Sequence, residues 1–88
     1  MKKNPKSRSI GKNILSYTIL LQPEPEGGYT VTVPNLPGCV TYGKDLREAK
    51  RMARDAIELY IEDLKADDIA DSVTREQPLV TTLEVVHS

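Results

Sequence analysis

The fold is decided by residues 27–43, which read GGYTVTVPNLPGCVTYG. Tyr29, Val31 and Val33 alternate with threonines, and this period of two is typical of a strand with one buried face. Pro34 ends the strand because proline has no backbone N–H to donate to a ladder. The stretch therefore predicts one short strand followed by a turn.

The sequence on either side of this strand predicts two more strands. Pro37 and Gly38 reverse the chain, and residues 39–42 are long enough for a short strand antiparallel to the one before. Upstream, residues 14–22 are predicted as the first strand, with Leu20 as an apolar exception on its polar face. The apolar face of that strand holds Leu15, Tyr17, Ile19 and Leu21. The three strands form an antiparallel meander.

An amphipathic helix is predicted after Asp45. Asp45 at the N-cap and Glu48 three residues later form a capping box. The face predicted to cover the sheet holds Leu46, Ala49, Ala53, Ala56, Ile57, Tyr60 and Leu64, widened by Met52, Leu59 and Ile61. The opposite face is charged and solvated, with the i,i+4 pairs Arg51–Asp55 and Arg54–Glu58 expected on it.

The last part of the chain is predicted to return to the sheet. Residues 65–78 are polar and acidic, and residues 80–86 have the β-branched content of a strand, with Leu83 and Val85 on the face opposite Glu84. The order is then β-β-β-α-β, in which a right-handed crossover places the last strand parallel to the first. The predicted class is α+β, a small sheet of three or four strands covered on one face by a helix.

The segment GGYTVTVPNLPGCVTYGKDLREA resembles the signature of the HicB-like antitoxins of type II toxin–antitoxin systems. The resemblance implies a partial ribonuclease H-like fold. It also implies a partner, a HicA-type toxin. Such toxins are small basic ribonucleases that use a histidine to cleave messenger RNA, and the antitoxin silences them by covering their active face. Longer members carry a DNA-binding domain after the last strand. This chain ends at Ser88, so we expect the short form and no DNA binding through such a domain.

The charges divide the chain into two parts. Residues 1–13 carry a net +5 and are predicted to be a basic disordered leader, whereas residues 14–88 form a single domain in which seven basic residues face thirteen acidic ones, a net −6. An acidic body suits a cationic partner. The candidate partner-binding residues are Glu24 and Glu26 in a loop, and Asp63, Asp67 and Asp68 at the exit of the helix.

Composition limits the other possibilities. The chain of 88 residues has no Trp or Phe, so its thin core is built mainly from aliphatic side chains, and a homodimer or larger oligomer is expected to cover sheet edges and residues such as Leu20 and Ile61. Cys39 is the single cysteine and is predicted to be a buried or half-buried thiol. No membrane span or signal peptide is recognisable, so a cytoplasmic location is expected.

No catalytic, cofactor or metal site is predicted, and the chain is not expected to be an enzyme. Ribonuclease H chemistry needs carboxylates that project from the sheet towards two metal ions, yet the three predicted strands contain no Asp or Glu. His87 is the only histidine and is predicted to be solvated. Two functions remain open: a toxin-neutralising antitoxin, and an orphan HicB-like binding or scaffold module without a toxin. A neighbouring reading frame for a short basic chain with a histidine would distinguish them.

Overall fold

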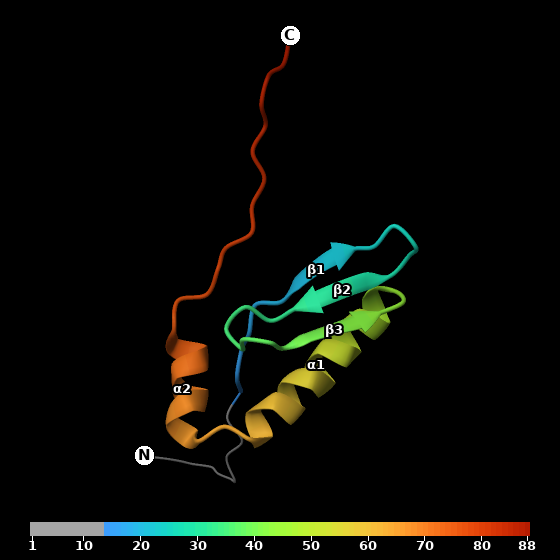
Figure 1. Ribbon diagram of the computed structural model, residues 1–88. Coiled ribbons are helices and arrows are strands. Elements are labelled where there is room, and N and C mark those ends of the chain that lie inside the picture. The colour runs from blue at the N-terminus through green and yellow to red at the C-terminus, as the bar shows by residue number, and fades with distance from the viewer. Residues whose placement is uncertain (1–13) are drawn as a thin grey trace.

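Three antiparallel strands are followed by two helices (Figure 1). The computed structural model describes residues 14–88, so the predicted leader, residues 1–13, lies outside the described residues. The strands form one sheet in the order β1-β2-β3. The α+β class is confirmed. The elements are β1 at Leu20–Pro23, β2 at Tyr29–Thr32, β3 at Val40–Gly43, α1 at Leu46–Glu62 and α2 at Ala66–Thr74.

The central strand has the burial pattern that its sequence predicts. Val31 pairs with Leu21 of β1 and with Thr41 of β3, and its side chain is fully buried on the face covered by α1. Val33, two residues later, is 1% exposed, while Thr32 between them is exposed. The period of two is therefore confirmed, and Pro34 lies beyond the end of the strand.

A close approach between β3 and α1 holds the helix on the sheet. A Cβ atom at Gly43 would collide with the backbone of Ala49, so glycine is required there. Ala49 and Ala53 are both buried, since alanine lets the helix lie near the strands. Leu46 and Leu59 are exposed, however, so the apolar stripe is narrower than predicted.

The start of α1 is capped much as expected. The Oδ1 atom of Asp45 accepts a hydrogen bond from the backbone N–H of Glu48 at 2.8 Å, but Glu48 Oε1 accepts from the backbone N–H of Lys44, not from that of Asp45. The predicted pairs Arg51–Asp55 and Arg54–Glu58 are wrong. The ion pair found among residues 14–88 joins Arg51 to Glu48 at 3.5 Å, because Glu48 one turn earlier is nearer.

The first strand is shorter than predicted. Residues 14–19 are not part of the ladder, because β2 ends at Thr32, which pairs with Leu20, and the turn after it carries the chain away. The side-chain amide of Gln77 instead serves two backbone groups of this segment. Its Nε2 donates to the carbonyl of Ser16 at 2.8 Å, and its Oε1 accepts from the N–H of Thr18.

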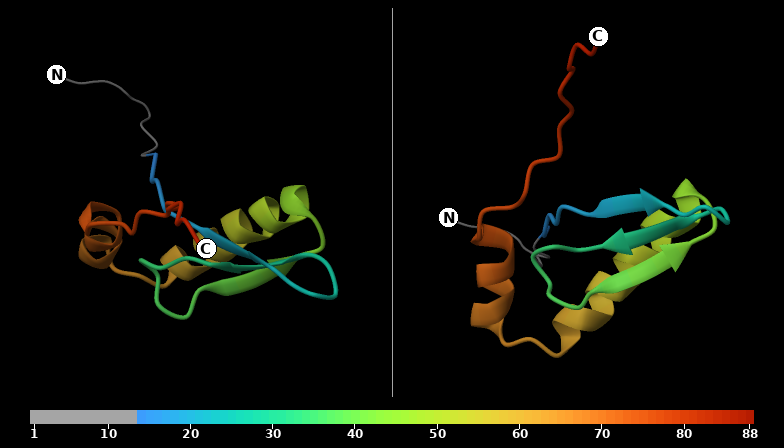
Figure 2. Two further views of the ribbon diagram at one scale, coloured as in Figure 1. Left: turned by 90° about the horizontal axis from the view of Figure 1, so that it is seen from above. Right: turned by 45° about the horizontal axis from the view of Figure 1, so that its top comes forward.

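Residues 65–86 were predicted wrongly. Residues 66–74 form the helix α2, where a polar connection was expected, and residues 75–88 contain no strand. Ile69 and Val73, four residues apart, are half-buried on α2, and this helical spacing was a signal for it. The predicted fourth strand is absent, since the chain after Gln77 runs away from the sheet (Figures 1 and 2). Within residues 14–88, neither helix is both long and apolar enough to cross a membrane.

Candidate protein-binding site

The turn between β2 and β3 is a rigid platform. The N–H of Val33 donates to the carbonyl of Cys39 at 3.0 Å, and between them Leu36 is 1% exposed in the core. Cys39 is buried, as predicted, and burial raises the pKa of its thiol above the ordinary value. The hydroxyl of Tyr60 on α1 donates to the carbonyl of Pro37 at 2.7 Å. The turn is thereby tied to the second half of α1.

Asn35, at the start of this turn, ties the platform to α2. Its Nδ2 atom donates to the backbone carbonyls of Ser72 at 3.0 Å and Arg75 at 3.2 Å, and so satisfies carbonyls at the end of α2 that have no helical partner. Asn35 and Ser72 are both buried. The hydroxyls of Ser72 and Tyr17 lie 2.6 Å apart. The Pro-Asn-Leu-Pro-Gly-Cys turn therefore positions α2, a role that the sequence did not reveal.

The end of the molecule held in this way is strongly acidic. Residues 55–76 carry eight acidic and two basic side chains, a net −6. Six of these carboxylates lie on the last turns of α1, the α1–α2 junction and α2, all exposed and none in an ion pair within the described part of the chain. We call this group the acidic end; it comprises Glu58, Glu62, Asp63, Asp67, Asp68 and Asp71.

Helix electrostatics account for only part of this arrangement. Asp67 and Asp68 lie in the first turn of α2, where negative charge stabilises a helix. Glu62 and Asp63 lie at the opposite pole, the C-terminal end of α1, where the last turn carries no basic residue and an anion is unfavourable by about 0.3–1 kcal/mol. These two carboxylates therefore do not serve the stability of α1, which favours a role in binding.

The structure separates the predicted binding residues into two groups. Asp63, Asp67 and Asp68 gather in the acidic end. Glu24 and Glu26 lie in the β1–β2 loop at the opposite end of the molecule (Figure 1). Glu24 is also engaged locally, since its Oε2 accepts a hydrogen bond from the Thr30 hydroxyl at 2.7 Å. Only the first group can therefore belong to one candidate partner-binding surface at the acidic end.

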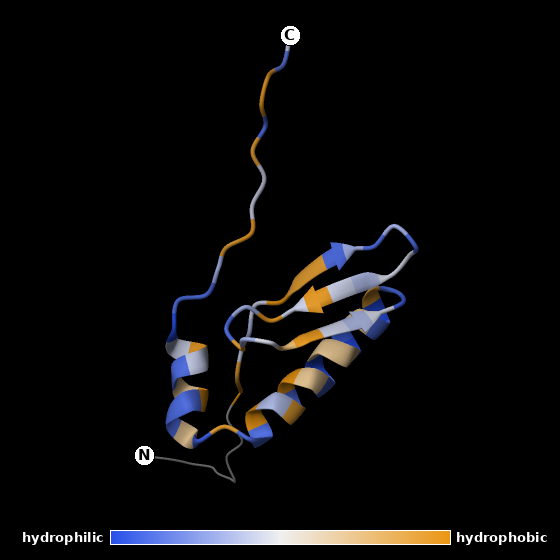
Figure 3. Cartoon of the chain, viewed as in Figure 1, coloured by the Kyte–Doolittle hydropathy of each residue, from blue (hydrophilic) through white to orange (hydrophobic). Residues whose placement is uncertain are grey.

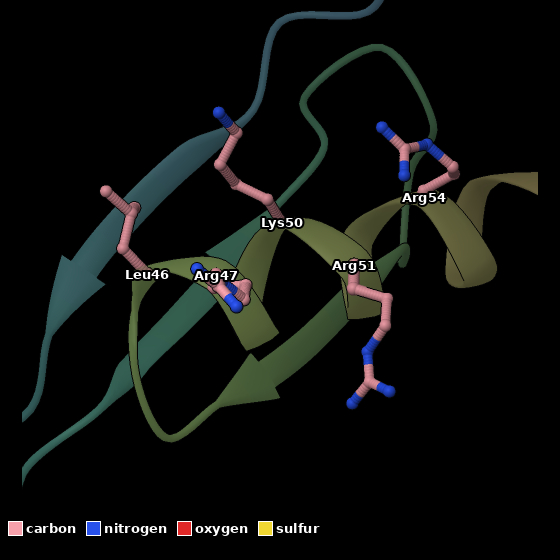
Figure 4. A pocket seen from close by; sticks show the side chains of 5 residues that line it. All are labelled: Leu46, Arg47, Lys50, Arg51 and Arg54. Atoms are coloured by element: carbon pink, nitrogen blue, oxygen red, sulfur yellow. The ribbon is translucent and has the colours of Figure 1, made fainter.

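A basic row on α1 interrupts the acidic body. Residues 44–54 carry five of the seven basic side chains of the body and two acidic ones, a net +3. Four of the cations extend from the first half of α1 beside the exposed Leu46, lining a shallow depression (Figure 4). They are Arg47, Lys50, Arg51 and Arg54. The helix α1 is thus basic at its start and acidic at its end. This division is visible in the sequence, but the net charge of −6 for residues 14–88 conceals it.

The described residues hold neither a metal-binding cluster nor an exposed thiol. Among residues 14–88, no three His, Cys, Asp or Glu side chains are grouped so that they could hold a metal ion. The one thiol is buried, and burial disfavours the thiolate that a nucleophile needs. What the structure offers is an exposed anionic surface on α1 and α2.

Comparison with known proteins points to one family. Residues 17–84 match the family model described as the HicB-like antitoxin of bacterial toxin–antitoxin system. A UPF0150 protein of Synechocystis sp. is 40% identical over 75 residues, 85% of this chain and 92% of that protein. A UPF0150 protein of Helicobacter pylori is 42% identical over 60 residues, 68% and 82% of the two chains. Antitoxin HicB of Escherichia coli K12 is 38% identical over 53 residues, 56% of this chain but 38% of that protein. No solved structure matches the chain.

Proposed function

The chain belongs to the HicB-like antitoxin family, and we propose that it binds and neutralises a HicA-type toxin by covering the active face of that ribonuclease. The observation that carries the proposal is the acidic end, six exposed carboxylates without intramolecular ion pairs among the described residues. A surface that binds RNA is cationic, and an anionic protein surface is attracted to it by the same field. The acidic end therefore competes with RNA for the toxin.

The position of the charges orients the toxin. The basic row on the first half of α1 repels a cationic partner, while the acidic end attracts it, so approach is favoured at one end of the helix. Asn35 fixes the C-terminal end of α2 against the β2–β3 turn, so the carboxylates of α2 keep one orientation relative to the sheet. A surface that is already ordered loses less conformational entropy when it binds. Glu24 and Glu26, at the other end, add only to the long-range field.

The experiment compares two charge reversals that change the net charge equally. Glu62→Lys, in the acidic end, should lower the association rate with a HicA-type toxin about threefold to tenfold and flatten its salt dependence. Glu26→Lys, in the β1–β2 loop, should change the association rate by less than about twofold. Both side chains are exposed, so neither variant should be destabilised; Glu62→Lys should raise the free energy of unfolding slightly, because it places a cation at the C-terminal end of α1. Equal effects of the two reversals would show that only net charge matters and that the acidic end is not the contact surface.

The alternative is an orphan HicB-like module that binds or scaffolds another protein. It is favoured by the names of the relatives that align over most of their length, since "UPF0150 protein" states no toxin partner. A neighbouring reading frame for a short basic chain with a histidine, and co-purification of its product with this chain, would decide for the antitoxin. Absence of both would decide for the orphan module.

A further inference from the structure

The chain after α2 is an extended apolar arm, residues 78–88. It leaves the body of the molecule and ends far from the sheet (Figures 1 and 2), with apolar positions along its length (Figure 3). Its five large apolar side chains are between 69% and 98% exposed: Leu79, Val80, Leu83, Val85 and Val86. So much exposed apolar surface on one short segment marks a contact with another surface.

The arm has the composition of a strand without a ladder. β-branched residues dominate it, and Leu83 and Val85 share one face while Glu84 lies on the other. An extended segment has unpaired backbone N–H and C=O groups, and the edge of a sheet pairs them. The arm therefore needs an open strand edge and an apolar surface beside it.

Both features lie at β1. This strand pairs with β2 on one side, and within the described chain no strand pairs with its other side. Beside the segment that leads into β1, a groove of about 550 Å³ runs along α1. The half-buried side chains of Tyr17, Ile19, Ile57 and Ile61 form its apolar floor, and the charged side chains of Lys50, Arg54 and Glu58 also line it. A strand added at this edge would place one of its faces over that groove.

We infer that the arm of one copy of this chain adds as a fourth strand to the β1 edge of a second copy, with Leu83 and Val85 in the groove, and that the exchange is reciprocal. The occupant is a second copy because the arm of each chain is anchored pointing away from its own edge. Gln77 is bonded to Ser16 and Thr18, and Pro78 follows immediately, so the arm departs from the body there. A reciprocal exchange satisfies both arms and both edges in one two-fold contact.

Sedimentation of the full chain at high micromolar concentration tests this inference. We expect the wild type to have twice the mass of one chain, with slow hydrogen exchange at the amides of residues 80–86. Leu83→Asp should weaken the dimer about tenfold or more, because it replaces the apolar contacts of Leu83 with a carboxylate that must lose its water beside Ile57 and Ile61. Thr82→Asp introduces the same side chain on the opposite face and should change dimer affinity by less than about threefold.

No arm residue packs in either hydrophobic cluster of the described chain, so both variants should retain the far-ultraviolet circular dichroism of α1 and α2. A monomeric wild type at this concentration would overturn the inference. So would a dimer that Leu83→Asp leaves intact. A monomer whose arm amides exchange slowly would show that the arm folds onto its own sheet, which also overturns the exchange between copies.

Discussion

Replacing Asn35 with aspartate tests whether the β2–β3 turn holds α2 in place. The two side chains have nearly the same shape, but the Nδ2 donor that bonds the carbonyls of Ser72 and Arg75 becomes an oxygen. Two hydrogen bonds are lost, each contributing about 0.5–1.5 kcal/mol, and a buried anion then faces two carbonyl oxygens. We expect Asn35→Asp to lower the free energy of unfolding by about 2–4 kcal/mol at neutral pH.

Urea unfolding of wild type, Asn35→Asp and Asn35→Ala measures this loss, and hydrogen exchange of the α2 amides reports whether the helix undocks locally. Part of the loss in Asn35→Asp should return in acid, because a protonated carboxyl group regains a donor. Burial beside carbonyl oxygens raises the pKa of the introduced carboxyl group in the folded protein. The stability that the protonated group contributes is therefore present below the pKa of this group in the unfolded chain, and it is lost as pH rises through the pKa of this group in the folded protein. The reasoning is refuted if both variants unfold within about 0.5 kcal/mol of wild type and the α2 amides exchange at the wild-type rate.

Three further predictions follow from the packing and from the strands. Gly43→Ala should lower the free energy of unfolding by about 1–3 kcal/mol or more, because the added methyl group collides with the backbone of Ala49; a wild-type urea midpoint would contradict this. Burial raises the pKa of the Cys39 thiol, so the stability that the protonated thiol contributes is present below the thiol pKa of the unfolded chain and is lost as pH rises through the thiol pKa of the folded protein. Iodoacetamide should label Cys39 only as fast as the protein opens, and rapid labelling of the native protein would contradict this. The pure protein should leave RNA and RNA–DNA hybrids intact with magnesium or manganese, since β1, β2 and β3 carry no carboxylate; cleavage that vanishes on replacing one of its own acids would disprove this.

Local patterns predicted the elements whose cause is local. The alternation through Val31 and Val33 gave the central strand, and the capping residues Asp45 and Glu48 gave the start of α1 within one residue. Pro34 marked the end of β2 because a missing N–H acts at the residue itself. The family resemblance rested on the same stretch, and the match over residues 17–84 confirms it.

The errors arose where pairing between distant segments decides the outcome. Residues 14–19 have the right alternation, but their neighbour β2 had already ended, so no ladder could form. Residues 80–86 likewise have strand composition but pair with no strand of the described chain. The contacts of Asn35 with Ser72 and Arg75 join residues 37 and 40 positions apart and depend on α2. They could not be predicted, because residues 65–78 were predicted to be a polar connection without a helix. The acidic end was only half found, since Asp63, Asp67 and Asp68 were named beside two distant loop glutamates.

The central claim is that the acidic end neutralises a basic ribonuclease, and inhibition of that enzyme tests it most directly. RNA cleavage by a HicA-type toxin would be measured while this chain is titrated in, as wild type and as Glu62→Lys. Wild type is expected to abolish cleavage near a one-to-one ratio of chains, whereas Glu62→Lys should require a clear excess, and a larger one at low salt than at high salt. Undiminished cleavage in the presence of excess wild-type chain would contradict it.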